Sequence, residues 1–441
     1  MTVTDSGRNS ASPGTSSSGS QHRDTRRGQV HSGASVDPLR WPDIAAVPHS
    51  PVRAAIARRL FRRAVDRLPL RVLEPGDRSY GGGTSADPVM QLVRPDSFWH
   101  RLGETGTIGF GEGYMAGDWT SDDLPSVLSA FAANMRTMIP PYLHRLRNAV
   151  LSVQPGHHDN TIEGARENIH LHYDLSNELF KLFLDETLTY SSAIFDGEPH
   201  DSPEALATAQ LRKIERLLDS AAVGPGTRVL EIGTGWGELS LRAAERGAIV
   251  TTVTISTEQA DLAKQRIEAA GMADRVTVLL QDYREVQGRY DAVVSVEMIE
   301  AVGANHWNTY FETIDRVLAP GGRVGLQAIL QDDYTVLATK DTYTWIRKYI
   351  FPGGQLASVE AIERTLAQHT SLRVSDRFSF GRHYAETLHR WRLEFEARAD
   401  EVGALGFDET FRRMWSLYLA YSEAGFRTGY LDVQQFTLTK G

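Results

Sequence analysis

The sequence predicts an α/β fold: a doubly wound parallel sheet, a smaller N-terminal α+β domain and a disordered N-terminal tail. Strands alternate with helices over about a hundred residues after position 227, which is typical of a parallel sheet covered on both faces. The first of these strands, 229–232, runs into a glycine-rich turn of the kind that holds a ligand beside such a sheet. By contrast, the first 45 residues are rich in Ser, Gly, Thr and Arg and have almost no apolar periodicity.

Length and composition favour two or three folded units in an ordinary water-soluble chain. The 441 residues are 41% hydrophobic and 23% charged, and we expect the divisions 1–45, 46–150 and 151–441. No run of eighteen apolar residues occurs and the first residues lack an apolar leader, so a cytoplasmic location is expected. The absence of cysteine excludes disulfides, thiolate metal sites and cysteine nucleophiles.

The charge is unevenly distributed along the chain. The first 70 residues hold eleven arginines and five aspartates and so carry +6, whereas the whole chain carries −9. This pattern argues against general nucleic-acid binding. Apolar residues recur every four positions over 51–68 with arginines between them, which predicts a basic amphipathic helix able to lie on an anionic membrane. The alternative is a helix packed on its own domain with a solvated arginine face.

Residues 70–135 mix short apolar runs with glycines and end in a predicted helix over 124–135, which indicates a small α+β domain. Hairpin turns are the expected role of Gly111, Gly113 and Gly117. The polar stretch up to residue 164 is expected to be a linker. His170 and His172 lack a further ligand set, so they are expected to be structural and no metal site is predicted.

A helix over 202–221 is expected to lead into the sheet. The strands that follow are predicted at 249–254, 276–280, 290–296 and 323–329, and the helices at 239–246, 257–270 and 306–318. A turn is predicted at 320–322, immediately before the last strand. The alternation breaks at 341–355, and helices from residue 384 onward are expected to cover one edge of the site.

The acidic residues at the strand ends distinguish between two kinds of adenosine-containing cofactor. Glu231 precedes the turn containing Gly233 and Gly235, where its carboxylate can accept hydrogen bonds from a ligand. A nicotinamide site would place an acid at the end of the second strand, but that strand ends in Thr-Ile-Ser. Instead Asp282 ends the third strand and Tyr283 can flank an adenine ring, which favours S-adenosylmethionine. The alternative for Asp282 is a helix cap or a surface loop acid.

Several longer motifs carry a resemblance to a known family. They are HYDLSNELF, LTYSSAIF, EIGTGWGE, TISTEQ, QDYRE, SVEMIEAVG, KYIFPGG, HYAETLHRW and AYSEAGFRTGYLDVQQF. From about residue 51 to the C-terminus the chain resembles the cyclopropane-fatty-acyl-phospholipid synthases and mycolic acid cyclopropane synthases. Within that family it looks most like actinobacterial members implicated in making tuberculostearic acid.

The resemblance implies methyl transfer to a cis double bond of an acyl chain in phospholipid. The alkene is the nucleophile, and the resulting carbocation loses a proton to a bicarbonate ion. Carried over by residue, the bicarbonate pocket comprises Ser192, Glu300, Gln327, the backbone of Ile329, and Tyr384. The family has cysteine and histidine where Ser192 and Gln327 stand, but serine and glutamine also donate hydrogen bonds. Glu297, nearby, is expected to be structural or indirect.

For S-adenosylmethionine, the resemblance and the residue chemistry indicate the same groups. They are Tyr190, Ser191, Gly233, Gly235, Thr254, Gln259 and Asp282. Tyr173 either closes over the cofactor or is an ordinary core tyrosine.

The product and the partners follow from the resemblance with alternatives open. A methylene-branched chain, which a separate reductase would convert to a 10-methyl chain, is slightly preferred to a cyclopropane. The expected partners are unsaturated phospholipids and the anionic inner face of a membrane, and a homodimer is one expected assembly. The alternatives are a methyltransferase for a soluble small molecule and a non-catalytic lipid-binding protein.

Overall fold

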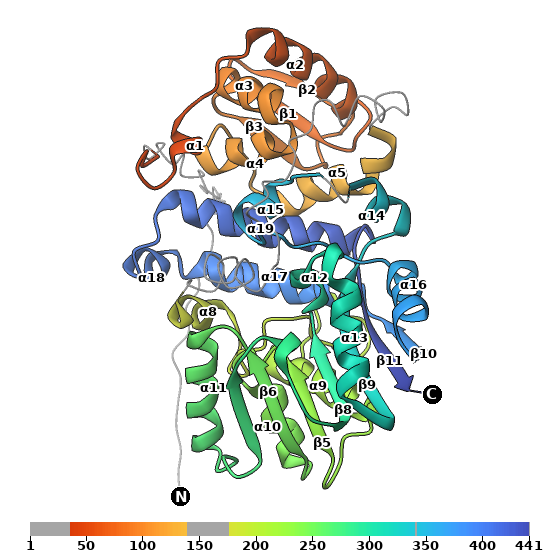
Figure 1. Cartoon of the computed structure of the whole chain (residues 1–441). Helices are drawn as coiled ribbons and strands as arrows, with labels where there is room; N and C mark the ends of the chain where they lie inside the picture. Colours follow the sequence, from red (N-terminus) through yellow and green to blue (C-terminus); the bar gives the residue numbers. More distant parts are fainter. Residues whose placement is uncertain (1–35, 139–175, 340–341, 441) are drawn as a thin grey trace, which may run out of the picture. The chain divides into compact units, whose positions relative to one another are not determined.

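Residues 36–138, 176–339 and 342–440 are described by the computed structural model, and the first of these ranges folds around a small sheet (Figure 1). Its strands pair in the order β2-β1-β3-β4, with β1 and β3 parallel and the other pairs antiparallel. The strands are β1 (Arg71–Glu74), β2 (Arg78–Tyr80), β3 (Val89–Leu92) and β4 (Trp119–Thr120). The helices are α1 (Pro42–Ala45), α2 (Pro51–Val65), α3 (Pro95–Thr105), α4 (Thr107–Ala116) and α5 (Leu124–Met138). Proline at the first position of α1, α2 and α3 presets the helical φ and needs no hydrogen-bond acceptor.

Helix α2 confirms the helix predicted over 51–68 as far as Val65, but the alternative in which its apolar stripe packs on the domain under a solvated arginine face is wrong. Ala54, Phe61 and Val65 are buried, whereas the predicted apolar stripe of Val52, Ile56 and Leu60 is exposed. Two arginines of the helix determine which of its sides faces the sheet. Arg58 and Arg62 both reach the buried carboxylate of Glu74, at 3.3 and 3.2 Å, so this side of α2 faces the sheet.

The expectation of a disordered tail up to residue 45 is wrong for residues 36–45. Ile44 is buried, and the guanidinium of buried Arg101 donates to the carbonyl oxygens of residues 43, 44 and 46. Arg101 is also paired with Asp118 at 3.0 Å. One buried cation thus holds the segment in place. Residues 1–35 lie outside the described residues.

The prediction of hairpin turns at Gly111 and Gly113, and the alternative of functional loops there, are also wrong, because both residues lie within helix α4. A side chain at Gly111 would meet the indole ring of Trp345, whose Cδ1 lies 2.4 Å from the position of an ideal Cβ. The glycine therefore allows a close approach between α4 and the C-terminal part of the chain. Gly117 ends the helix at a φ of +79°.

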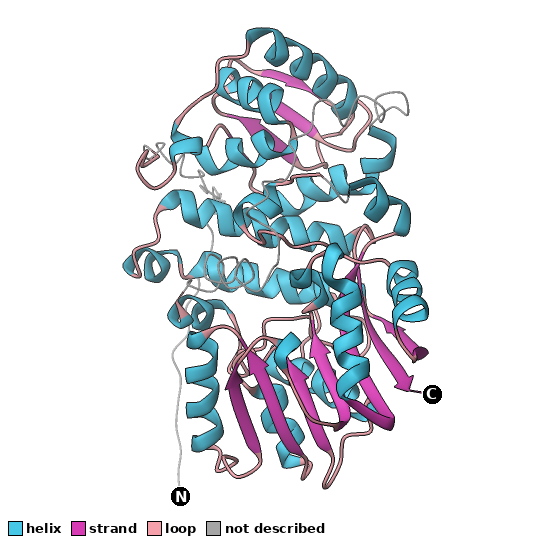
Figure 2. Cartoon of the chain, viewed as in Figure 1, coloured by secondary structure: helices cyan, strands magenta, loops and turns pink. Residues whose placement is uncertain are grey.

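Within the described residues a second sheet of seven strands forms the larger part of the protein, in the order β10-β11-β9-β8-β5-β6-β7 (Figure 2). Strands β5 to β9 run parallel, as predicted. They are β5 (Arg228–Ile232), β6 (Ile249–Thr254), β7 (Val276–Leu280), β8 (Tyr290–Val296) and β9 (Leu318–Leu330). The predicted turn at 320–322 lies inside β9, where Gly321 has a φ of +74° and the register with β8 shifts.

Helices cover both faces of this sheet, and successive strand residues show which helix lies where. Val229 packs with α9 (Leu206–Ser220), α10 (Glu238–Glu245) and α11 (Thr257–Ala269). The next residue, Leu230, packs with α13 (Trp307–Val317) and α16 (Val359–His369) on the opposite face. The arrangement confirms the doubly wound sheet.

Strands β10 (Leu372–Ser379) and β11 (Asp432–Lys440), which the sequence analysis did not predict, extend the sheet. β11 is antiparallel to both β9 and β10 and lies between them. Between β10 and β11 the chain forms α17 (Gly381–Ala397), α18 (Ala399–Ala404) and α19 (Glu409–Arg427). The remaining described helices are short. They are α8 (Asn177–Phe183), η3 (Tyr283–Glu285), α12 (Ile299–Val302), η4 (Ala304–His306), α14 (Asp333–Thr339) and α15 (Trp345–Tyr349).

The small sheet domain is joined to the later helices by specific polar contacts. Arg413 of α19 donates to the carbonyl oxygens of Tyr114 and Trp119, at 2.5 and 3.0 Å. Lys348 of α15 pairs with Glu112 at 2.7 Å. The described residues thus form one unit rather than separate lobes.

Candidate active site

A cavity lies at the carboxyl ends of β5, β6, β7 and β8, where a doubly wound sheet binds its ligands. It is lined by nine of the ten residues predicted to bind the cofactor, which come from the carboxyl ends of β5, β6 and β7, the segments that follow them, and one preceding loop. They are Tyr190, Ser191, Glu231, Gly233, Gly235, Thr254, Gln259, Asp282 and Tyr283. The tenth, Tyr173, lies outside the described residues, as do His170 and His172.

The glycine turn brings the backbone close to this cavity. Gly233 and Gly235 have φ values of +94° and +50°. An ideal Cβ at Gly233 would lie 2.6 Å from Cγ of Met298, so a side chain there would collide with this residue, which follows the end of β8. Only glycine satisfies both conditions without strain. The turn leads into α10, whose N-terminal end also borders the cavity through Glu238.

Two buried carboxylates at the strand ends differ in their partners. Glu231 accepts a hydrogen bond from Ser240, and burial raises its pKa to about 7. Asp282 accepts from the Arg284 backbone N–H at 2.9 Å and from the Arg284 guanidinium at 2.8 and 2.7 Å. Asp282 therefore caps the short helix η3 and lines the cavity at once, so its two predicted roles coexist.

The other predicted residues form the cavity wall through mutual hydrogen bonds. The Thr254 hydroxyl lies 3.1 Å from the Gln259 side-chain oxygen, and the Tyr190 hydroxyl lies 2.7 Å from that of Tyr418. Ser191 accepts a 2.6 Å hydrogen bond from the ammonium group of Lys213. Burial lowers the pKa of Lys213 to about 8, against the opposing effect of nearby carboxylates.

The groups that the resemblance assigned to bicarbonate converge on the carboxylate of Glu297, which lines the cavity at the end of β8. Its Oε1 accepts from the Ser192 backbone N–H at 3.1 Å and from the Gln327 amide at 2.8 Å. Its Oε2 accepts from the Tyr384 hydroxyl at 2.7 Å. The Ser192 hydroxyl instead donates to the Ala193 carbonyl. Burial raises the pKa of Glu297, and its three hydrogen bonds oppose this effect.

A network of neighbouring polar groups orients the Gln327 amide. Arg216 donates to Oε1 of Gln435 at 2.7 Å, so the Gln435 amide nitrogen faces the other way. That nitrogen donates to the Lys213 carbonyl and to Oε1 of Gln327, both at 3.1 Å. The Gln327 nitrogen is thereby directed at Glu297.

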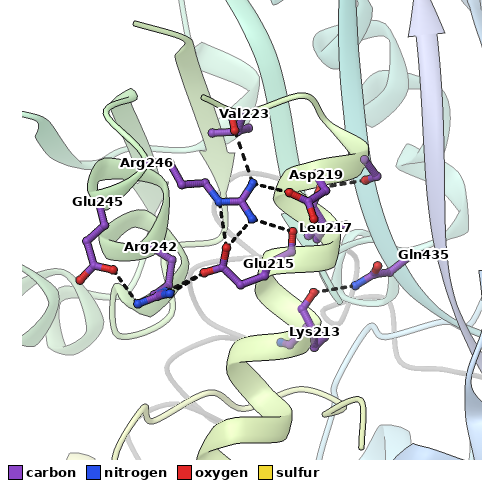
Figure 3. A network of polar contacts seen from close by, with 10 residues as sticks. Lys213, Glu215, Leu217, Asp219, Val223, Arg242, Glu245, Arg246 and Gln435 are labelled. Atoms are coloured by element: carbon purple, nitrogen blue, oxygen red, sulfur yellow. Dashed lines mark hydrogen bonds and ion pairs between the residues drawn. The ribbon is translucent and has the colours of Figure 1, made fainter. Parts of the chain in front are cut away.

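Helix α9 carries both Lys213 and Arg216 and is fixed to α10 by ion pairs. Figure 3 shows Glu215 bridging Arg242 and Arg246, with the Gln435 amide directed at the carbonyl of Lys213 on the same helix. Arg246 also pairs with Asp219 at 2.7 Å. These contacts hold the helix that positions the cluster around Glu297.

Glu300 lies three residues after Glu297, in the short helix α12. One of its oxygens accepts from the Ile329 backbone N–H, and the other is buried and has no hydrogen-bond partner among the residues that the structure describes. Burial and the charge of Glu297 raise the pKa of Glu300 to about 8. The predicted residues Ser192, Gln327, Ile329 and Tyr384 thus hold two carboxylates of the chain itself, Glu297 and Glu300.

Sequence reasoning missed the roles of Lys213 and Gln435 and undervalued Glu297. The sequence does indicate that Lys213 is buried, because it recurs with Ala209 and Leu217 at the spacing of a buried helix face. No pattern indicates a role for Gln435, because its strand was not predicted. The position of Glu297 two residues after the apolar core of a strand was visible, but its partners are 30 to 105 residues away.

Two searches of the described ranges bear on the type of site. They contain no group of three His, Cys, Asp or Glu side chains placed to hold a metal ion. They also contain no helix with the length and apolarity needed to cross a membrane.

Comparisons with known proteins identify the family of the chain. The sequence model of the family described as mycolic acid cyclopropane synthetase matches residues 160–436. The chain is 51% identical to tuberculostearic acid methyltransferase UfaA1 of Mycobacterium tuberculosis, over 92% of this chain and 97% of that protein. It is 33% identical to cyclopropane-fatty-acyl-phospholipid synthase of Escherichia coli, over 85% and 93%.

A solved structure with a bound ligand shares the fold. It is mycolic acid cyclopropane synthase CmaA1 complexed with SAH and CTAB, with a TM-score of 0.57 and 29% identity. The match covers 65% of this chain and 99% of that chain.

Proposed function

The chain belongs to the mycolic acid cyclopropane synthetase family, and on this premise we propose that it methylates unsaturated fatty acyl chains. The methyl group goes from S-adenosylmethionine to the cis double bond of an acyl chain in phospholipid. The observation that carries the proposal is one cavity in which the cofactor-binding strand ends and the Glu297 cluster meet.

The residues of the cavity fit S-adenosylmethionine. Gly235, where a side chain would meet open space, leaves room for a ligand beside the backbone, and Asp282 and Glu231 supply acceptors for its amine and hydroxyl groups. When bound, the cofactor supplies an electrophilic methyl group. The chain aligns that methyl with the alkene, and such positioning contributes much of the rate for a weak nucleophile. A role for Tyr173 over the cofactor stays a prediction.

Carboxylates of the chain account for the charge that develops on the acyl chain. Methyl transfer leaves a carbocation, which a nearby carboxylate stabilises electrostatically. We assign this role to Glu300, whose second oxygen is buried and accepts no hydrogen bond from the described part of the chain. Glu300→Gln is expected to abolish turnover while binding of S-adenosylhomocysteine, measured by calorimetry, stays intact. Retained turnover would remove Glu300 from the mechanism.

The preferred product is a methylene-branched chain. The relative that aligns over nearly the whole chain is a tuberculostearic acid methyltransferase, which supports this choice over a cyclopropane. A separate reductase would then convert the methylene group to a methyl branch. The cyclopropane stays the alternative, because proton loss from the transferred methyl closes a ring when no hydride has shifted and leaves a methylene branch when one has.

Helix α2 provides a surface suited to an anionic bilayer at the inner face of the membrane, where the substrate lies. Val52, Ile56 and Leu60 are exposed in one stripe, and Arg59 and Arg63 are exposed beside them. Exposed apolar residues flanked by arginines are suited to insertion among anionic head groups.

The membrane contact is tested by co-sedimentation with anionic vesicles. The double variant Ile56→Glu, Leu60→Glu should bind vesicles several-fold more weakly, whereas Leu405→Glu, exposed elsewhere, should bind as the wild type does. Equal binding by all three proteins would contradict the assignment. The predicted homodimer is tested separately by light scattering.

The activity is tested by incubating the protein with methyl-labelled S-adenosylmethionine and oleoyl phospholipid vesicles. Mass spectrometry of the acyl chains should show one added labelled carbon, and its fragmentation distinguishes a methylene branch from a ring. Stearoyl phospholipid, which has no double bond, is the matched control. Label that appears only in soluble acceptors would favour a small-molecule methyltransferase, and no label in any acceptor would refute the proposal.

A further inference from the structure

The Glu297 side chain is fixed at the wall of the cavity. Among the described residues, three groups donate hydrogen bonds to its carboxylate, namely the Ser192 N–H, the Gln327 amide and the Tyr384 hydroxyl. None of these donors is charged. The carboxylate is therefore fixed in place without being neutralised, and Oε2, which accepts one of these three bonds, keeps a lone pair for a further proton.

The other carboxylates of the cavity are less available. Asp282 is paired with Arg284 and Glu238 with Arg266, each at 2.7 Å. Glu231 accepts a hydrogen bond from Ser240 of α10. Among the carboxylates that line the cavity, Glu297 is the one that accepts a hydrogen bond from Tyr384, whose ring packs against Trp391 and Phe426.

The backbone of Glu297 adds a second observation. Its φ of +52° lies in the left-handed region, which costs a residue with a side chain roughly 1–2 kcal/mol. Its N–H donates to the Gln327 carbonyl at 2.8 Å, so the conformation is fixed by the same residue that binds its carboxylate. Strain of this kind concentrates at functional sites.

Free bicarbonate does not fit this arrangement. The Ser192 N–H, the Gln327 amide and the Tyr384 hydroxyl already donate to Glu297, and the Ile329 N–H donates to Glu300. A bicarbonate ion would find these donors occupied and would lie beside one or two negative carboxylates. Like charges at such short range are strongly unfavourable away from water.

We propose that the Glu297 carboxylate is the proton acceptor of the reaction and that the enzyme uses no free bicarbonate. This inference rests on the proposed methylation of an alkene. The π electron pair forms the new carbon–methyl bond while the methyl–sulfur bond breaks and leaves its pair on sulfur, and the adjacent alkene carbon becomes positive. A hydride then shifts from the methyl-bearing carbon to that carbon, which moves the positive charge to the branch point. A lone pair of Glu297 takes a proton from the transferred methyl group, and the released C–H pair forms the methylene double bond. The neutral carboxylic acid afterwards returns its proton to solvent.

The test compares wild type with Glu297→Gln and Glu297→Gly in carbon-dioxide-free buffer, with and without added bicarbonate, formate or acetate. Glutamine keeps the size and the hydrogen-bonding positions but accepts no proton. Glycine suits the φ of +52° and opens a space for a small anion. Glu245→Gln, an exposed residue of α10, is the matched control.

The wild type and Glu245→Gln should methylate oleoyl phospholipid at the same rate with and without bicarbonate. Glu297→Gln should be slower by about a hundredfold or more, the usual contribution of a general base. Glu297→Gly should be equally slow and should regain activity with formate, acetate or bicarbonate. Calorimetry with S-adenosylhomocysteine should give unchanged binding for both variants.

Several results would overturn the inference. These are stimulation of the wild type by bicarbonate, full activity of Glu297→Gln, or failure of every small anion to rescue a Glu297→Gly protein that still binds S-adenosylhomocysteine. If both variants lose that binding, the wild type decides, because bicarbonate independence supports the inference and dependence refutes it. A wild type that methylates no phospholipid would instead refute the proposed function.

Discussion

Replacing Gln435 by glutamate should reverse the amide of Gln327 and so weaken the hold on Glu297. The new carboxylate keeps its contact with Arg216 but cannot donate to the Gln327 oxygen or to the Lys213 carbonyl. Gln327 can satisfy the new acceptor only by turning its nitrogen toward residue 435. Its oxygen then faces Glu297 in place of the donor at 2.8 Å.

The size of the effect follows from the hydrogen bond that is lost. A hydrogen bond to a charged group contributes about 1.5–3 kcal/mol. At about 1.36 kcal/mol for each factor of ten, kcat/KM should fall about 10- to 150-fold. Because Gln435 does not line the cavity, the affinity for S-adenosylhomocysteine should change little. Gln287→Glu, which adds the same charge on the surface, should leave both values unaltered.

A double-mutant cycle measured with oleoyl phospholipid vesicles checks the reasoning. In a Gln327→Leu background residue 435 has no amide to orient, so Gln435→Glu should cause little further loss. If the same fold loss occurred in both backgrounds, Gln435 would act by another route and the orienting role would be refuted.

Three further expectations concern stability and are measured by urea denaturation. Burial places the pKa of Glu300 at about 8, above the 4.5 of an exposed carboxyl, so its contribution to stability is full below pH 4.5 and is lost as the pH rises through 8. Glu300→Gln should therefore flatten the decline in stability between these values, and parallel profiles would argue against the assignment. Arg101→Met should cost about 3–5 kcal/mol because Arg101 is buried with Asp118, whereas exposed Arg40→Met should cost at most about 1 kcal/mol. Gly111→Ala should cost about 1–3 kcal/mol through its collision with Trp345, whereas Gly403→Ala, which meets open space, should not destabilise; equal effects would contradict the packing argument.

The parallel part of the sheet was predictable because each of its strands is a local pattern. Strands β5 to β8 are rich in β-branched and aliphatic residues, and the predicted bounds differ from the observed ones by at most a residue or so. β10 and β11 were missed because they mix charged or amide side chains with apolar ones and do not continue the alternation of helices and strands. The face that α2 buries could not be predicted, because its arginines have a buried partner, Glu74, that no local pattern reveals.

The candidate site divides in the same way. The residues of the glycine turn and the acids at strand ends were found because position on a strand fixes their location. The cluster around Glu297 joins residues from a loop, two strands and a helix, and only the assembled fold brings them together. The resemblance identified the surrounding donors but not the carboxylate that they bind.

The placement of β11 sets an order on the assembly of the protein during synthesis. β11 pairs with β9 and β10 on its two sides, yet residues 432–440 are translated after both. The gap between those strands has to stay open, or be reopened, until the ribosome releases this segment. Gln435 arrives with it, so a nascent chain that already has its cofactor turn still lacks the group that directs Gln327 toward Glu297. Such a chain is expected to bind S-adenosylhomocysteine before it reaches its full rate of methyl transfer. Little methyl transfer is therefore expected before the sheet is complete.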